Sequence, residues 1–137
     1  MGLFQKCCAA MMVLFAGVVP CVYADDACLE GKVISKEGRA NAAYAFDGDV
    51  STYYESHSAD GQWVGLDLGR QYVITHISFT PRQNGSIGSD RMLLSLFEGA
   101  NRSDFMDAVP LYLISEAPEQ DKTCDVDVRV SRGFRYV

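Results

Sequence analysis

Short apolar runs separated by turn residues fill the second half of the chain, and they constrain its fold more than any other feature. Apolar and polar side chains alternate along segments 62–68 and 72–79, as in strands that bury one face. Gly69 and Pro81 are expected to end these two strands. Further strands are expected at 91–98, 109–115, 126–130 and 134–137. Only 40–46 has a helical tendency, so the pattern predicts an all-β sandwich or jelly roll.

The first 24 residues are typical of an export signal. One positive charge precedes the segment 7–19, which contains no charged or strongly polar side chain. The segment is shorter than the roughly 20 apolar residues of a membrane-spanning helix, and Pro20 interrupts it. Small side chains at Val22 and Ala24 predict cleavage after Ala24 and secretion of residues 25–137 as one domain. An uncleaved anchor is the alternative.

Size and charge exclude several classes of function. Cleavage would leave 113 of the 137 residues, enough for one modest core, and loss of Lys6 would change the formal charge from -6 to -7. Nucleic acid and membrane partners are therefore not expected. The chain contains no nucleophile elbow, zinc helix motif or phosphate loop, so we expect no enzyme activity.

Two cysteines, Cys28 and Cys124, would remain after signal removal. In an oxidising compartment, two cysteines near opposite ends of a domain are candidates for a disulfide. Two separate thiols are the alternative, and the sequence does not decide between them. Neither cysteine has a histidine or a third cysteine at zinc-ligand spacing, so no zinc site is expected.

Oxygen ligands are concentrated in the turn Asp47-Gly48-Asp49, which is followed by the hydroxyl of Thr52. Calcium takes six to eight oxygen ligands, and a tight turn through Gly48 can direct two carboxylates and backbone carbonyls toward one point. The same tripeptide is also common in ordinary turns. By itself, the segment therefore indicates either a calcium site or a plain turn.

This turn is the first of several motifs that occur in a characteristic order. The later motifs are Tyr53-Tyr54-Glu55-Ser56, Gly61-Gln62-Trp63-Val64-Gly65-Leu66-Asp67-Leu68-Gly69, Tyr72-Val73-Ile74-Thr75-His76-Ile77, Pro81-Arg82, Phe97-Glu98-Gly99-Ala100-Asn101 and Gly133-Phe134-Arg135-Tyr136-Val137. Their order resembles the F5/8 type C, or discoidin, domains and related carbohydrate-binding modules. The resemblance covers about Ala40 to Val137 and implies a galactose-binding-like jelly-roll β-sandwich.

The resemblance implies a structural calcium ion at the Asp-Gly-Asp turn. Its expected ligands are the side chains of Asp47, Asp49 and Thr52 and the backbone carbonyl of Tyr44. Family members also contribute a glutamate from a final strand beyond the position of Val137, and this strand is expected to be missing here. We therefore expect weakened calcium binding, and an open sheet edge that favours self-association.

The resemblance also implies a sugar site in the loops at one end of the sandwich. Its expected residues are Tyr54, Glu55, His57, Arg82 and Asn84. Arginine offers a planar fork of donors, glutamate accepts hydrogen bonds, and an aromatic ring can stack on a sugar. Glu55 stands where sugar-binding relatives often have a histidine, so the identity of the sugar stays open.

Three other aromatic positions and His76 have structural interpretations. Tyr53 and Tyr54 should point in opposite directions if the chain is extended, so one of them is expected in the core. Trp63 lies in an alternating strand and is expected to pack in the core rather than serve as a sugar platform. His76 has no second histidine or cysteine nearby and is expected to be structural.

Together, these observations predict a secreted, non-catalytic, lectin-like module that binds glycans or glycoproteins. A discoidin domain for protein, cell or membrane adhesion is one alternative, and a non-functional fragment is another. An ordinary surface ion pair is the alternative for Arg82.

Overall fold

The computed structural model describes residues 7–9, 27–38, 40–58, 61–82, 89–120 and 122–137. The elements of this part of the chain are β1 (Cys7–Ala9), β2 (Ala27–Cys28), β3 (Lys32–Ser35), the 3-10 helix η1 (Ala40–Ala45), β4 (Val64–Val73), β5 (His76–Phe79), the 3-10 helix η2 (Ser89–Met92), β6 (Leu96–Gly99), β7 (Val109–Leu113), β8 (Cys124–Asp127) and β9 (Gly133–Tyr136). The chain is therefore built mostly of strands, as the sequence predicts.

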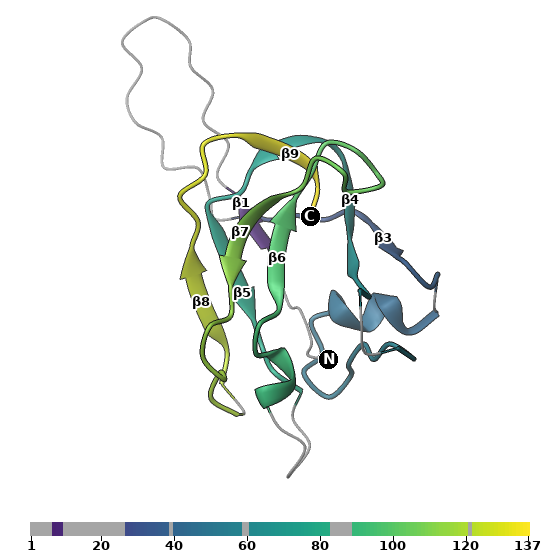
Figure 1. Cartoon of the computed structure of the whole chain (residues 1–137), viewed down its shortest axis with the longest axis vertical. Coiled ribbons are helices and arrows are strands. Elements are labelled where there is room, and N and C mark those ends of the chain that lie inside the picture. Colours follow the sequence, from purple (N-terminus) through teal and green to yellow (C-terminus); the bar gives the residue numbers. More distant parts are fainter. Residues whose placement is uncertain (1–6, 10–26, 39, 59–60, 83–88, 121) are drawn as a thin grey trace, which may run out of the picture.

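The strands form two antiparallel layers that share one core (Figure 1). One layer has the order β2-β1-β5-β8. In the other, β3-β4-β9 is joined to the β6-β7 hairpin by a bridge between Ala100 and Tyr136. Side chains from both layers meet in a single buried cluster that includes Leu66, Ile77 and Phe97. This arrangement confirms the predicted β-sandwich.

Alternating strand residues supply the core. Leu66 and Leu68 of β4 are buried, as are Ile77 and Phe79 of β5. The rings of Phe79 and Phe97 lie 5.2 Å apart across the layers. Burying a side chain of this size stabilises the fold by about 1.5–3 kcal/mol. The alternation read from the sequence is therefore the pattern that holds the two layers together.

Trp63 lies one residue before β4 and is half-buried. Its ring centroid is 5.0 Å from that of Phe105, and both side chains line an apolar cavity of about 100 Å³ next to Phe97. Trp63 therefore packs against other apolar side chains, although it is less enclosed than a core tryptophan.

Several predicted boundaries are wrong. The predicted strand 72–79 is divided between the end of β4 and β5, and the predicted strand 126–130 is Cys124–Asp127 in the structure. Two further differences have a local cause. Strand β4 continues through Gly69, whose φ is +75°. Its pairing with β9 shifts in register between Asp67 and Tyr72, and this irregularity accommodates the left-handed conformation of Gly69. The predicted strand 91–98 begins with η2 instead, and Leu94 has a φ of +64°, so β6 starts only at Leu96. Local backbone conformation set both boundaries.

The order of strands in the first layer separates the two candidate disulfide cysteines. Cys28 lies on β2 and Cys124 on β8, with β1 and β5 between these strands. Neighbouring strands are about 4.8 Å apart, so the two alpha carbons lie well beyond the roughly 7 Å limit for a disulfide. No disulfide joins them in the described part of the chain. Burial raises the pKa of the Cys124 thiol, as expected for a packed side chain.

Strand β1 comes from the segment predicted to be the export signal. Cys8 pairs with Cys28 on one side and with His76 on the other. The structure thus gives residues 7–9 a place in the sheet, while cleavage of the predicted signal stays a prediction. In the described part of the chain, no helix is long and apolar enough to cross a membrane.

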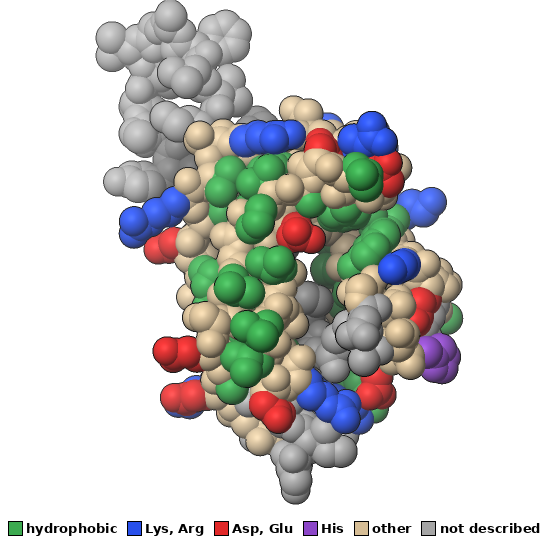
Figure 2. Space-filling model, viewed as in Figure 1, with side chains coloured by type: hydrophobic (Ala, Val, Ile, Leu, Met, Phe, Trp, Pro, Cys, Tyr) green, Lys and Arg blue, Asp and Glu red, His purple; other side chains and the backbone are tan. Residues whose placement is uncertain are grey.

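Large apolar side chains are exposed over the β6-β7 hairpin (Figure 2). Leu96 and Leu113 are opposite each other in the register, and Leu94 is 70% exposed. Partners directly opposite in an antiparallel pair share one face of the sheet, so Leu96 and Leu113 form one apolar surface, and the exposed Leu94 lies two residues before Leu96. We call Leu94, Leu96 and Leu113 the leucine surface.

Candidate functional site

A pocket of about 540 Å³ lies beside η1. Four of the predicted site residues line it: Tyr44, Thr52, Glu55 and His57. The helix packs against β3 through a small apolar cluster that contains Ala42 and Ala45. Gly48, with a φ of +79°, turns the chain back after the helix and brings residues 51–57 to the other wall of the pocket.

The Asp-Gly-Asp turn is organised by its own hydrogen bonds. The carboxylate of Asp47 accepts hydrogen bonds from the backbone amide of Asp49, at 2.8 Å, and from the Thr52 hydroxyl, at 2.7 Å. The Asp49 carboxylate accepts from the hydroxyl of Ser51, at 2.6 Å, and from its amide. The Ser51 hydroxyl lowers the pKa of Asp49, so this carboxylate is ionised at neutral pH.

The oxygen atoms of this turn are of the type that calcium binds. Asp47, Asp49 and Thr52 carry oxygen donors within one turn, and Tyr44 lines the adjoining pocket. Among the described residues, no group of three or more His, Cys, Asp or Glu side chains could hold a metal ion. An ion here would thus take the rest of its ligands from hydroxyl and backbone oxygens.

The structure corrects the role of Tyr54. Its side chain is 1% exposed and packs with Ala42 and Ala45, so its ring does not reach a ligand in the pocket. The neighbouring Tyr53 lines the pocket instead. One tyrosine of the pair is in the core, as expected, but the alternation alone did not tell which one.

Arg82 is held in a fixed position against Tyr53 and Glu55, two residues that line the pocket. Its guanidinium lies 3.5 Å from the centre of the Tyr53 ring, and it donates a 2.5 Å hydrogen bond to the Tyr53 hydroxyl. The same side chain forms an ion pair with Glu55 at 3.5 Å. The structure thus brings together Arg82 and Glu55, which are 27 positions apart in the sequence.

The sequence analysis missed Arg91 and Asn41, besides Tyr53 and the pocket serines Ser51 and Ser56. Arg91 of η2 donates a 3.1 Å hydrogen bond to the Glu55 carboxylate, from a segment that was expected to be a strand. Asn41 also lines the pocket, and its buried side-chain oxygen has no hydrogen-bond partner in the described structure. Neither residue belongs to a local motif, so only their spatial neighbours mark them.

The remaining predicted ligand residues are less enclosed. His57 is exposed, and its backbone amide donates a 3.3 Å hydrogen bond to Glu37. Asn84 lies outside the described residues. The structure therefore places Glu55 and His57 in the lining of the pocket and Arg82 in contact with Glu55, and it leaves the role of Asn84 a prediction.

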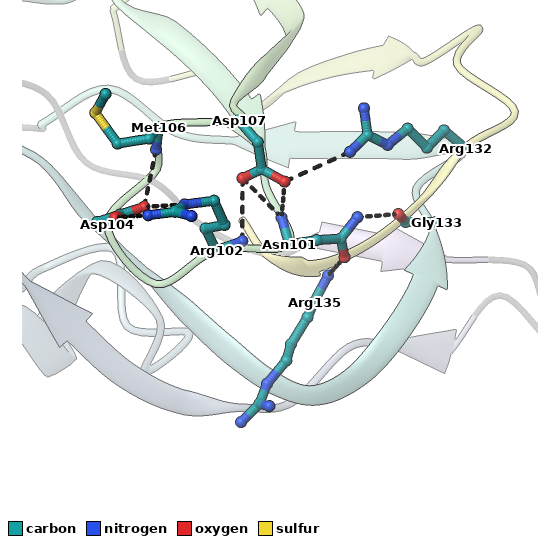
Figure 3. A network of polar contacts seen from close by, with 8 residues as sticks. All are labelled: Asn101, Arg102, Asp104, Met106, Asp107, Arg132, Gly133 and Arg135. Carbon is teal, nitrogen blue, oxygen red and sulfur yellow. Dashed lines mark hydrogen bonds and ion pairs between the residues drawn. The ribbon is translucent and has the colours of Figure 1, made fainter.

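A second polar network holds the loop after β6 to β9 (Figure 3). Asn101 donates to the backbone carbonyl of Gly133 and accepts from the amide of Arg135. The Asp107 carboxylate accepts from the amides of Asn101 and Arg102. Because the Asn101 side chain bonds to the backbone of β9, the network has a structural role. The Phe97-to-Asn101 motif therefore corresponds to a residue that holds the loop after β6 against β9.

Together, fold and pocket define a jelly-roll β-sandwich with a polar loop pocket. The F5/8 type C domain model matches residues 30–103. A solved structure titled as CBM62 from Clostridium thermocellum Xyl5A is 41% identical, covers 79% of this chain and 81% of its own, and superposes with a TM-score of 0.69. This chain belongs to the F5/8 type C domain family. No curated protein matches it.

Proposed function

We propose that this domain is a non-catalytic module that binds carbohydrate through the pocket beside η1. One observation carries the proposal: the Arg82 guanidinium is fixed over Tyr53 and next to Glu55, and these two residues line the 540 Å³ pocket. The similar structure belongs by its title to a class of carbohydrate-binding modules, which supports the same function.

The chemistry of these side chains suits a sugar. A guanidinium donates in a plane to hydroxyl oxygens, and a carboxylate accepts from hydroxyl protons. The Asn41 oxygen is a further acceptor at the pocket wall. Because Tyr53 already fixes Arg82, little side-chain entropy would be lost on binding.

Substitution of Arg82 tests this function. Hydrogen bonds from a charged group contribute about 1.5–3 kcal/mol, so we expect Arg82→Ala to weaken glycan binding by about tenfold or more. A glycan array would find the ligand, and calorimetry on the full chain would measure the loss. Arg129→Ala, an exposed arginine after β8, is the matched control. Unchanged binding by a folded Arg82→Ala protein would contradict the proposal.

We also propose that calcium binds at the Asp-Gly-Asp turn. The two carboxylates and the Thr52 hydroxyl support this, and a bound ion would stabilise the folded state by mass action. At a calcium concentration of about 100 Kd, we expect a gain of about 2.7 kcal/mol, measured by thermal unfolding. Asp47→Asn should remove the gain, and Glu116→Gln, an exposed carboxylate elsewhere, should retain it. Equal melting temperatures with and without calcium would argue against the site.

Secretion after cleavage at Ala24 is part of the proposed function. The thirteen-residue apolar segment and the small residues before Asp25 support it. Amino-terminal sequencing of the protein recovered outside the cell is expected to begin at Asp25. A protein that keeps Met1 in the membrane fraction would show an uncleaved anchor instead.

An adhesive function is the second candidate, and the leucine surface favours it. Exposed apolar surfaces of this kind mark contacts with proteins. We propose a protein partner or a second copy rather than a membrane, because the acidic chain has no excess of basic residues to attract anionic lipids. Co-sedimentation with phosphatidylserine vesicles would contradict this choice.

A further inference from the structure

We propose that the pocket selects sugars that carry a carboxylate, such as uronic acids, over neutral sugars of the same shape. The inference rests on the proposed carbohydrate-binding function and concerns the same site. It comes from one cluster, which we call the arginine pair: Arg82 and Arg91 converging on Glu55.

Three separate segments build this cluster. Glu55 follows the Asp-Gly-Asp turn, Arg82 follows β5, and Arg91 belongs to η2. One carboxylate oxygen of Glu55 lies 3.1 Å from a guanidinium nitrogen of Arg91 and 3.5 Å from one of Arg82. Two guanidinium groups and one carboxylate leave a net charge of +1, although the whole chain has a formal charge of -6. The cluster is therefore positively charged, whereas the protein as a whole is negatively charged.

Nearby carboxylates are directed into other contacts. Those of Asp47 and Asp49 accept hydrogen bonds within their own turn, and Glu37 accepts the backbone amide of His57. These carboxylates are therefore engaged by the protein's own donors, while the guanidinium groups of Arg82 and Arg91 lie against Glu55, which lines the pocket.

Partial burial reduces the solvent screening of the Arg82 charge, whereas Arg91 is exposed. The side chain of Arg82 is 15% exposed and that of Arg91 is 41% exposed. Solvent screens a partly buried charge less than a fully exposed one. A sugar carboxylate can accept charge-assisted, bidentate hydrogen bonds from a guanidinium, whereas a hydroxyl accepts only weaker single bonds. The carboxylate is thus the ligand group that the arginine pair recognises best.

Matched sugar pairs provide the test. Calorimetry or NMR titration of the full chain would compare methyl galacturonide with methyl galactoside, and methyl glucuronide with methyl glucoside. We expect at least one uronide to bind about tenfold more tightly than its neutral partner at low salt, with the preference falling as salt screens the charge. Neutral sugars that bind as tightly as their uronides would overturn this inference alone. If neither kind binds, the proposed function fails as well.

Two variants should move the preference in opposite directions. Arg91→Gln makes the cluster neutral and should reduce the uronide-to-neutral ratio by about fivefold. Glu55→Gln raises the net charge of the cluster and should increase that ratio. Arg129→Gln removes the same charge at a distant exposed site and should leave the ratio unchanged, with folding of each variant checked by thermal unfolding. Equal ratios in Arg91→Gln and Arg129→Gln would overturn the inference.

Discussion

His76 joins two strands of the first layer through contacts that depend on its protonation. Its ring nitrogens lie 3.2 Å from the Asp125 carboxylate and 3.3 Å from that of Asp127, both on β8. The hydrogen bond with Asp125 is the main cause of a raised pKa for His76, and the same bond lowers the pKa of Asp125. The structural role expected for His76 is thus a cross-strand ion pair.

The pH dependence of stability should report this contact. The raised pKa of His76 means that its stabilising contribution is complete below 6.5 and is lost as pH rises through the folded value. The lowered pKa of Asp125 means that its contribution is present above 3.8 and is lost in stronger acid. We expect the ion pair to stabilise the protein by less than about 1 kcal/mol, mostly between these values, because it is exposed.

Chemical denaturation of the wild type and of His76→Gln between pH 5 and 8.5 would measure how much this ion pair contributes to the free energy of unfolding. The two proteins should differ most near pH 5.5 and converge at pH 8.5. A difference that grows toward pH 8.5 would show that another group controls the dependence.

Strands β6 and β9 meet where the two parts of the second layer join. The Ala100 amide donates to the Tyr136 carbonyl at 2.8 Å, and the Tyr136 amide donates back at 2.9 Å. A β-carbon at Gly99 would lie 2.5–2.8 Å from atoms of the buried Phe134 ring. Glycine at this position is therefore a packing requirement of the strand pair.

Gly99→Ala should be destabilising for this reason. The added methyl group would displace the Phe134 ring, and overpacking of this kind costs about 1–3 kcal/mol. At Gly133 the nearest side-chain atom would be the β-carbon of the exposed Gln71, at 3.3 Å, so Gly133→Ala should cost less. Urea denaturation of both variants would compare them. Equal stability of the two would show that Phe134 can move without cost.

Processing affects the whole molecule, because β1 belongs to the predicted signal. Cleavage after Ala24 would remove the strand between β2 and β5 and leave backbone groups of β5 without their partners. Open sheet edges pair readily with other strands. We therefore propose that the processed chain self-associates through this edge.

Sedimentation velocity of residues 25–137 at several concentrations is the measurement. We expect a concentration-dependent dimer. Combined substitution of Leu96→Ser and Leu113→Ser disrupts the leucine surface and should leave edge-mediated association intact. Loss of the dimer in this double variant would assign the association to the leucine surface instead, and a monomer at all concentrations would contradict self-association.

Local pattern predicted the strands that alternate clearly. Segments 109–115 and 134–137 correspond to β7 and β9, because strands with one buried face repeat every two residues. The short strands β2 and β3 were not predicted, since a few residues contain too little periodicity. At the site, the order of motifs indicated Glu55 and Arg82, whereas Arg91 was missed because its partner is 36 residues away.

By itself, the sequence determined that the chain is an all-β domain and which turn concentrates oxygen atoms, because alternation and turn chemistry are local properties. Only the tertiary structure decided that Tyr54 is buried while Tyr53 supports Arg82, and that two arginines share Glu55. It also separated Cys28 from Cys124 by two strands. These facts depend on the order of strands and on contacts between distant segments, which arise only when the two layers pack around a common core.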